Sequence, residues 1–147
     1  SAASDVYKRQ GPGDPKDLPE VIENIKKLIG KKPIFGICLG HQLMALANGA
    51  DTYKMKFGHR GINQPVKYLA TGRIYISAQN HGYAVDEKSL EGKGINISHI
   101  SMNDGTIEGL EYTKHPTFTV QYHPEACPGP GDHDYLFKHF VDMMEGR

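Results

Sequence analysis

The chain has 147 residues, enough for one domain with a sizeable hydrophobic core. Its 17 lysines and arginines balance its 17 aspartates and glutamates, so charge gives no argument for binding nucleic acid or an anionic membrane surface. No apolar run approaches the length of a membrane span. The number and spacing of the two cysteines, Cys38 and Cys127, do not support a cysteine-rich zinc site, and we expect both to be reduced, as in a cytosolic protein.

The first predicted elements are a turn and a helix. Residues 11–15 read Gly-Pro-Gly-Asp-Pro, which is the composition of a tight turn. Asp17 is expected to cap the helix, with Glu20 three residues later as in a capping box, and Gly30 is expected to end it. Apolar residues recur at helical spacing between these ends: Leu18, Val21, Ile22, Ile25, Leu28 and Ile29.

A sharp turn between a strand and a helix comes next. Residues 33–37 form a short apolar run that predicts a buried strand, and residues 41–48 predict a helix. Between them, Gly36-Ile37-Cys38-Leu39-Gly40 has the pattern of a nucleophile elbow, with sulfur in place of oxygen. The glycines relieve crowding in such a turn, and the helix N-terminus favours a thiolate. Cys38 is therefore the predicted nucleophile, although free cysteines are often small buried hydrophobic residues.

After Gly49 the pattern changes to strands and turns. Strands are expected over residues 66–69, 73–78, 94–101, 106–112 and 117–122, and a helix from about residue 132. Residues 57–61 and 79–83 are polar and are expected to be loops, while Asn103-Asp104-Gly105 predicts a hairpin turn. Helices and strands in this order indicate an α/β fold with parallel strands at the centre of the sheet.

The strand over residues 117–122 leads into His123-Pro124-Glu125. A cysteine nucleophile needs a base, and the base needs an orienting partner. His123 and Glu125 supply both if the turn, which Pro124 stiffens, brings their side chains together. The other seven histidines are more simply explained as surface or hydrogen-bonded residues. The same His-Pro-Glu matches the H-x-E of zinc nucleobase deaminases, but their P-C-x-x-C does not follow.

Three blocks now stand in order: residues 11–15, 36–42 and 123–125. In that order they resemble the class I, triad-type glutamine amidotransferases. Further blocks resemble the carbamoyl phosphate synthetase small-subunit family: residues 57–61, 79–85 and 121–130. The resemblance implies an α/β fold with an open, mostly parallel, flavodoxin-like sheet flanked by helices, and an antiparallel β extension.

The resemblance also implies a mechanism. Cys38 would attack the carboxamide of glutamine to form a glutamyl thioester and release ammonia, while His123 moves protons and Glu125 orients His123. The backbone N–H groups of Leu39 and Gly13 would form the oxyanion hole. Further positions would hold the glutamine substrate: Gly11, Gln42, Asn80, Gly82 and Tyr83. The resemblance implies no metal and no cofactor in this chain.

The implied partner is the large synthetase subunit, which would use ATP and the ammonia to make carbamoyl phosphate for pyrimidine or arginine synthesis. One alternative is an amidotransferase serving GMP, anthranilate or imidazole-glycerol-phosphate synthesis, against which residues 58–61 and 126–130 argue. Another is a non-catalytic regulatory subunit of the same fold, against which the intact Cys38, His123 and Glu125 argue. No nucleic acid or membrane partner is expected, and the expected location is the cytoplasm.

The resemblance starts at residue 11. The family's amidotransferase domain has further strands before this block, and residues 1–10 do not resemble the strand expected there. We therefore expect residues 1–10 to be a non-native leader and residues 11–147 to be a partial amidotransferase domain, truncated at its N-terminus. Such a domain would expose an apolar sheet edge.

Overall fold

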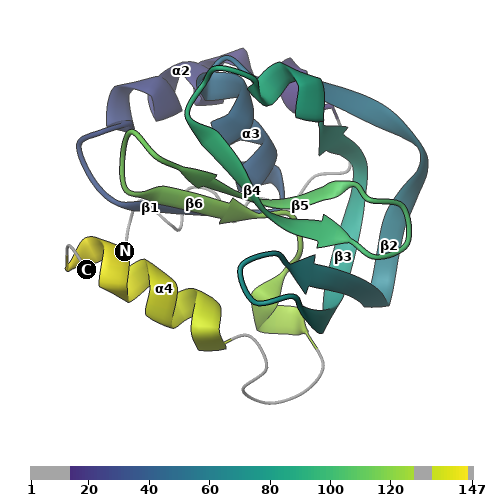
Figure 1. The fold of residues 1–147 in the computed structure, drawn as a ribbon. Coiled ribbons are helices and arrows are strands. Elements are labelled where there is room, and N and C mark those ends of the chain that lie inside the picture. Colours follow the sequence, from purple (N-terminus) through teal and green to yellow (C-terminus); the bar gives the residue numbers. More distant parts are fainter. Residues whose placement is uncertain (1–13, 128–133, 146–147) are drawn as a thin grey trace.

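The computed structural model of the chain describes residues 14–127 and 134–145. Figure 1 shows a curved sheet with helices α2 (Pro19–Leu28) and α3 (Leu39–Ala47) on one face and α4 (Asp134–Met144) on the other. The leader at residues 1–10 and the block at residues 11–13 lie outside the described residues. None of the helices among the described residues is long and apolar enough to cross a membrane.

Six strands form one sheet, in the order β1-β6-β5-β4-β2-β3. Their bounds are β1 Ile34–Ile37, β2 Thr52–Tyr68, β3 Arg73–Val85, β4 Ile95–Ser101, β5 Ile107–Tyr112 and β6 Thr117–Val120. Three short 3-10 helices complete the elements: η1 Pro15–Asp17, η2 Glu87–Leu90 and η3 Pro124–Ala126. The α/β class and the antiparallel extension are confirmed. Parallel pairing is scarcer than expected among the described residues, because only β1 and β6 run parallel and the other four pairings are antiparallel.

The two polar segments expected to be loops lie in strands instead. Residues 57–61 belong to β2 and residues 79–83 to β3, and the two segments lie opposite each other in the antiparallel β2–β3 pair. His59 lies opposite His81 in this pairing, and both side chains are buried. The loop prediction was wrong because it relied on the polarity of these segments. Their buried side chains are held by hydrogen bonds rather than by apolar packing.

The helix start was also predicted wrongly. Asp14, not Asp17, acts as a cap, since its side chain accepts a hydrogen bond from the backbone N–H of Lys16 at 2.9 Å and so begins η1. α2 then begins at Pro19, with Leu18 before it and no side-chain cap. A proline suits the first helical position and keeps the residue before it out of the helical conformation. The capping box therefore does not form.

Apolar residues pack in two clusters, one on each face of the sheet. The first joins Ile25 of α2 and Leu43 of α3 to Leu110 of β5. The second joins Phe35 of β1 and Phe118 of β6, whose rings stack 4.5 Å apart, and includes Leu136 of α4. Helices on both faces therefore fix the β1–β6 pair, from which the elbow leaves the sheet.

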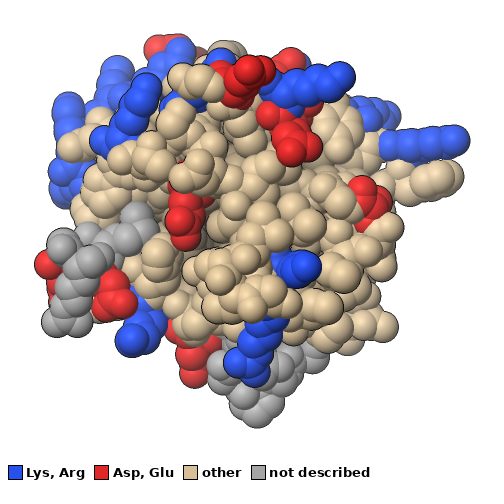
Figure 2. Space-filling view, viewed as in Figure 1, with Lys and Arg blue, Asp and Glu red and all other residues tan. Residues whose placement is uncertain are grey.

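The outer surface carries no obvious single-sign field on the face seen in Figure 2, where acidic and basic side chains are scattered around uncharged surface. This mixture matches the balanced composition, with 17 basic and 17 acidic residues. Electrostatic steering of a highly charged polymer is therefore not suggested by this face.

Gly36 controls how closely α3 approaches β6. A Cβ at this position would lie 2.8 Å from Thr119 Cγ2 and 3.1 Å from the backbone of Gly40. We predict that Gly36→Ala lowers the free energy of unfolding by about 1–3 kcal/mol through overpacking, measured by urea denaturation. Gly82→Ala is the matched control, since its nearest neighbour would be 3.5 Å away. An equal loss in both variants would contradict the close approach at Gly36.

Candidate active site

Cys38 lies at the turn between β1 and α3, in the N-cap position of the helix. It is the one non-glycine residue with a positive φ in the part of the chain that the structure describes, with φ 53° and ψ −108°. Its backbone N–H donates to the carbonyl of Val120 at 2.9 Å, which ties the turn to β6. A strained conformation of this kind, held in place by its surroundings, is typical of functional sites. The geometry matches the nucleophile elbow.

The Cys38 sulfur is enclosed, and the residue is only 4% exposed. Its Sγ lies 4.0 Å from the carbonyl oxygen of Asn80 and 3.9 Å from Nε2 of Gln121. The imidazole of His123 also lies close enough to the sulfur for the two groups to interact electrostatically. Groups from β3 and from the segment after β6 therefore surround the sulfur.

His123 contacts both of its expected partners. Its Nδ1 lies 3.1 Å from Oε1 of Glu125, and η3 provides the turn that brings the two side chains together. The interaction with Cys38, and then the hydrogen bond with Glu125, raise the pKa of His123 to about 10. The imidazolium form is thus favoured at neutral pH, opposite a sulfur that can carry negative charge. The Glu125 side chain is 51% exposed, which weakens its electrostatic contribution.

Cys127 has a different environment from Cys38. Its Sγ lies 3.0 Å from the His123 carbonyl oxygen, to which it donates, and 3.3 Å from the Ala78 backbone nitrogen, from which it accepts. Burial raises the pKa of this thiol. Cys127 therefore braces the segment that carries His123, and burial outweighs the one contact, the Ala78 N–H, that favours a thiolate.

Some of the expected glutamine-binding residues gather around the sulfur. Gln42 is buried, and its Nε2 donates to the Tyr83 carbonyl at 2.8 Å and to Oε1 of Gln121 at 3.0 Å. Asn80 presents its carbonyl to Cys38, while its side chain is exposed. Leu39 follows Cys38 as the first residue of α3, where helix N–H groups lack internal partners.

The remaining expected residues are distributed less evenly. Gly82 and Tyr83 lie in β3 and are half-buried. Gly11 and Gly13 lie outside the described residues. The roles of this set in holding glutamine stay predictions.

A cavity of about 360 Å³ opens beside His123 and Glu125. Residues of β2, β3 and the segment after β6 line it: Gly61, Ile62, Ala78, Gln79, Asn80, His123, Glu125 and Ala126. Since His123 and Glu125 belong to this wall, a small molecule in the cavity would lie against this pair of side chains.

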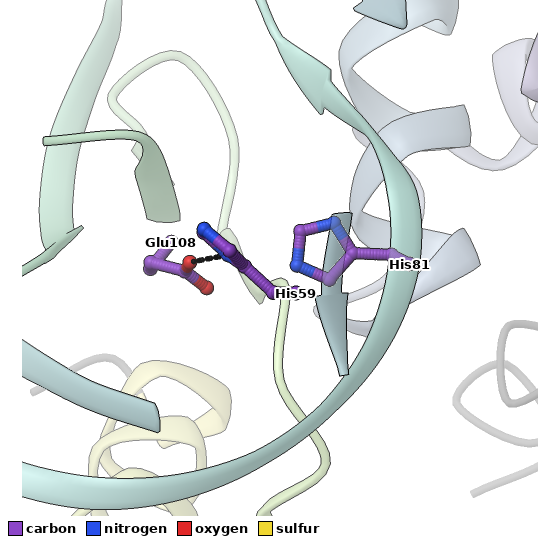
Figure 3. A group of neighbouring side chains, drawn as sticks. All are labelled: His59, His81 and Glu108. Atoms are coloured by element: carbon purple, nitrogen blue, oxygen red, sulfur yellow. Dashed lines mark ion pairs between the residues drawn. The ribbon is translucent and has the colours of Figure 1, made fainter. Parts of the chain in front are cut away.

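A buried polar network lies behind this wall, and the sequence did not reveal it. Figure 3 shows Glu108 of β5 facing His59 of β2, with the His81 ring from β3 beyond them. His59 Nδ1 lies 3.0 Å from Glu108 Oε1, and its Nε2 lies 2.7 Å from Asp104 Oδ2. His59, His81 and Glu108 come from three different strands. Their spacing along the sequence matches no known motif, so only the fold shows that they meet.

The His81 ring is also held at both nitrogens. Its Nδ1 lies 2.8 Å from the Tyr83 carbonyl, and its Nε2 lies 2.7 Å from Oε1 of Gln79. His59, His81 and Glu108 have ligand atoms within 4.8 Å of one another and are the group among the described residues that could hold a metal ion. Each imidazole nitrogen of this group lies close to a protein oxygen.

Burial and charge act in opposite directions on these groups. Burial raises the pKa of Glu108 to about 7, against the opposing effect of its contact with His59. Burial alone would lower the pKa of His59. The hydrogen bonds and charges of Glu108 and Asp104 outweigh this effect and raise the pKa to about 9. Burial lowers the pKa of His81 to about 4.

The strain at Cys38 leads to a prediction about stability. At an ordinary position glycine is less stable than alanine by roughly 0.5–1 kcal/mol. At the φ and ψ of Cys38 we expect the opposite order, with Cys38→Gly more stable than Cys38→Ala by about 1 kcal/mol, because only glycine relieves the strain. Urea denaturation measures the difference. Ala47 of α3 and its Ala47→Gly variant serve as the control pair, in which the ordinary order should hold.

Glu108 leads to a prediction about pH. Its folded pKa of about 7 exceeds the ordinary value of 4.5, so between these values the folded state keeps a proton that the unfolded chain has released. Its contribution to stability is therefore complete below pH 4.5 and declines as the pH rises through 7. Glu108→Gln removes this decline, and relative to the wild type it should gain on the order of 1–3 kcal/mol between pH 4.5 and 7.5.

Urea denaturation at the two pH values tests this expectation. Glu111→Gln is the control, because Glu111 is half-exposed and pairs with His139 at the surface. A constant difference between Glu108→Gln and the wild type at both pH values would contradict the raised pKa.

The chain is similar to known proteins over most of its length. The family model described as glutamine amidotransferase class-I matches residues 9–143. A carbamoyl phosphate synthase small chain from Listeria monocytogenes serotype 4b (strain F2365) is 63% identical over 142 residues, which is 97% of this chain and 39% of the relative. The protein of the same name from Bacillus cereus (strain ATCC 14579) is 63% identical over 135 residues, covering 92% of this chain and 37% of the relative. The chain thus spans about two fifths of the length of these relatives.

Solved structures share the fold. A putative GMP synthase component from Thermoplasma acidophilum superposes with a TM-score of 0.70 at 21% identity, covering 90% of this chain and 68% of that one. A glutamine amidotransferase from Thermotoga maritima gives a TM-score of 0.61 at 21% identity, covering 94% and 61%. With the family model matching most of its length, the chain belongs to the class I glutamine amidotransferase family.

Proposed function

We propose that this chain is the glutamine-hydrolysing part of a carbamoyl phosphate synthase small chain, with Cys38, His123 and Glu125 as its catalytic triad. The observation that carries the proposal is the arrangement of His123, which contacts the elbow sulfur on one side and Glu125 on the other. Relatives at 63% identity that carry the name carbamoyl phosphate synthase small chain support the choice of pathway over GMP or anthranilate synthesis.

In the first half of the proposed reaction, the Cys38 thiolate attacks the carboxamide carbon of glutamine. A carbon–sulfur bond forms, and negative charge develops on the carboxamide oxygen. The backbone N–H of Leu39 at the start of α3 is suited to stabilise this oxyanion, with Gly13 as the second expected donor. His123 then gives its proton to the nitrogen, the carbon–nitrogen bond breaks, and ammonia leaves with a glutamyl thioester on Cys38.

In the second half, water attacks the thioester. His123, now neutral, takes a proton from the water, and the carbon–sulfur bond breaks to release glutamate and the thiolate. Glu125 holds Nδ1 of His123 and so leaves the other imidazole nitrogen for proton transfer. The imidazolium–thiolate pair is restored, and no redox partner is needed.

The proposed partner is a large synthetase subunit. The relatives are named as the small chain of carbamoyl phosphate synthase, and a small chain implies that the enzyme also has a large one. In this proposal the ammonia passes to that subunit, which uses ATP and bicarbonate to make carbamoyl phosphate, and the chain itself requires no cofactor. The site would operate in the cytoplasm, where both thiols stay reduced.

Activity measurements test the proposal in the full-length small chain together with its large subunit. Cys38→Ala should lower glutamine hydrolysis by at least about 10³-fold, because the nucleophile is lost. Synthesis of carbamoyl phosphate from added ammonia should be unchanged. Glu125→Gln should cost less, about 10-fold to 100-fold, because the carboxylate is half-exposed and only orients His123.

Cys127→Ser is the control for loss of a thiol. Its side chain is expected to keep the contacts with Ala78 and His123, and glutamine hydrolysis should stay within a few-fold of the wild type. Glutamine hydrolysis that survives Cys38→Ala would exclude the proposed mechanism.

A further inference from the structure

We infer that Gln121 is a further catalytic residue, whose carboxamide N–H donates to the Cys38 sulfur, orients it and stabilises its thiolate form. This inference rests on the proposed role of Cys38 as the nucleophile. Gln121 lies between β6 and His123, and it is 0% exposed. Its backbone N–H donates to the Glu108 carbonyl at 2.8 Å, so its position is fixed by the sheet.

A buried carboxamide needs partners for both its oxygen and its nitrogen. For Gln121 the oxygen accepts from Gln42 Nε2 at 3.0 Å, and the nitrogen lies 3.9 Å from Cys38 Sγ. Among the described residues, the Cys38 sulfur is thus the acceptor that the side-chain N–H groups of Gln121 contact. A purely structural role would not require the polar end of this side chain to meet the sulfur.

The direction of the Gln121 amide follows from its neighbours. Oxygen and nitrogen of a glutamine amide look alike, so their assignment needs an unambiguous reference. The Tyr83 backbone carbonyl supplies it, because a carbonyl oxygen only accepts; the Gln42 atom 2.8 Å away must therefore be the nitrogen. That same nitrogen lies 3.0 Å from Gln121, which must present its oxygen there and its nitrogen to the sulfur.

This polarity determines the chemistry. A donor to sulfur favours the thiolate over the thiol, and a bond to a charged acceptor is shorter and stronger than one to a neutral acceptor. The distance of 3.9 Å is long, so we expect the contact to tighten as the sulfur becomes anionic. Unlike His123, a carboxamide does not release its proton, so Gln121 remains a donor while His123 delivers its proton to the leaving ammonia.

The same hydrogen bonds give Gln42 a second expected role, besides the contact with glutamine that the sequence predicts. Its nitrogen is engaged by the Tyr83 carbonyl and by Gln121, so part of its effect on the reaction would come through the sulfur rather than through the substrate. The expected contact of Gln42 with glutamine would then involve its remaining oxygen.

The test measures the Cys38 thiol directly in the full-length protein. The rate of alkylation of Cys38 by iodoacetamide is followed against pH by mass spectrometry, in the absence of glutamine. In Gln121→Met, which keeps the length of the side chain and removes the donor, the midpoint of the pH profile should rise by about one pH unit. The rate near neutral pH should fall by about 10-fold.

Thr119→Val is the matched control. Thr119 is as deeply buried on β6, and its hydroxyl forms a hydrogen bond with Nδ1 of His41 at 2.7 Å rather than with the sulfur. It should lose stability without moving the alkylation midpoint. Gln121→Asn provides a second variant that keeps a polar group but is too short to join Gln42 to the sulfur, and its midpoint should rise in the same direction.

A folded Gln121→Met or Gln121→Asn variant with the wild-type midpoint would overturn the inference, and circular dichroism establishes the folding. The result is separable from the proposed function. An unchanged midpoint in a protein that hydrolyses glutamine normally counts against Gln121 alone. A shifted midpoint in a protein that cannot hydrolyse glutamine under any condition counts against the proposed function alone.

Discussion

The parallel pairing of β1 with β6 is the constraint on which the site depends. Ile37 lies opposite Val120, and the next N–H, that of Cys38, donates to the Val120 carbonyl at 2.9 Å. Both strands end at this edge, so the residues that leave them meet there: Cys38 from one strand and His123 from the other. A slip of one residue would turn every side chain of the strand to the opposite face and separate sulfur from imidazole. The geometry of the proposed triad is therefore a property of strand register, which the aromatic stack of Phe35 on Phe118 helps to hold.

A second layer of buried polar groups supports the site from behind. The Tyr83 carbonyl accepts from His81 Nδ1 and from Gln42 Nε2, each at 2.8 Å. A carbonyl oxygen has two lone pairs, so one atom can satisfy both donors. This oxygen joins the network around His59 to the chain of hydrogen bonds that runs through Gln42 and Gln121 to the Cys38 sulfur. Changes in either group of residues should therefore be felt by the other, as is common for contacts within one hydrogen-bond network.

The local parts of this architecture could be predicted from the sequence, and the long-range parts could not. Gly36 and Gly40 flank Cys38 within five residues, and Glu125 follows His123 by two, so a single short window carries each signal. His59 and Glu108 are 49 positions apart and meet only because β2 and β5 belong to one sheet. Strand patterns assume an apolar inward face. A strand that buries histidine and glutamine reads as a loop for that reason, and Gln121 looks like any polar residue at a strand end.

The φ of 53° at Cys38 also bears on how such a sequence would change over evolutionary time. An ordinary buried residue is kept because replacing it weakens the fold. Here the fold alone would favour glycine, and only the chemistry of the thiol opposes that drift. In a lineage that no longer uses the proposed reaction, this position should therefore be among the first to change, well before Gly36 or the strands that frame it. Cysteine at this position in a related sequence therefore indicates continued selection for a reactive thiol, because the backbone conformation by itself would favour glycine.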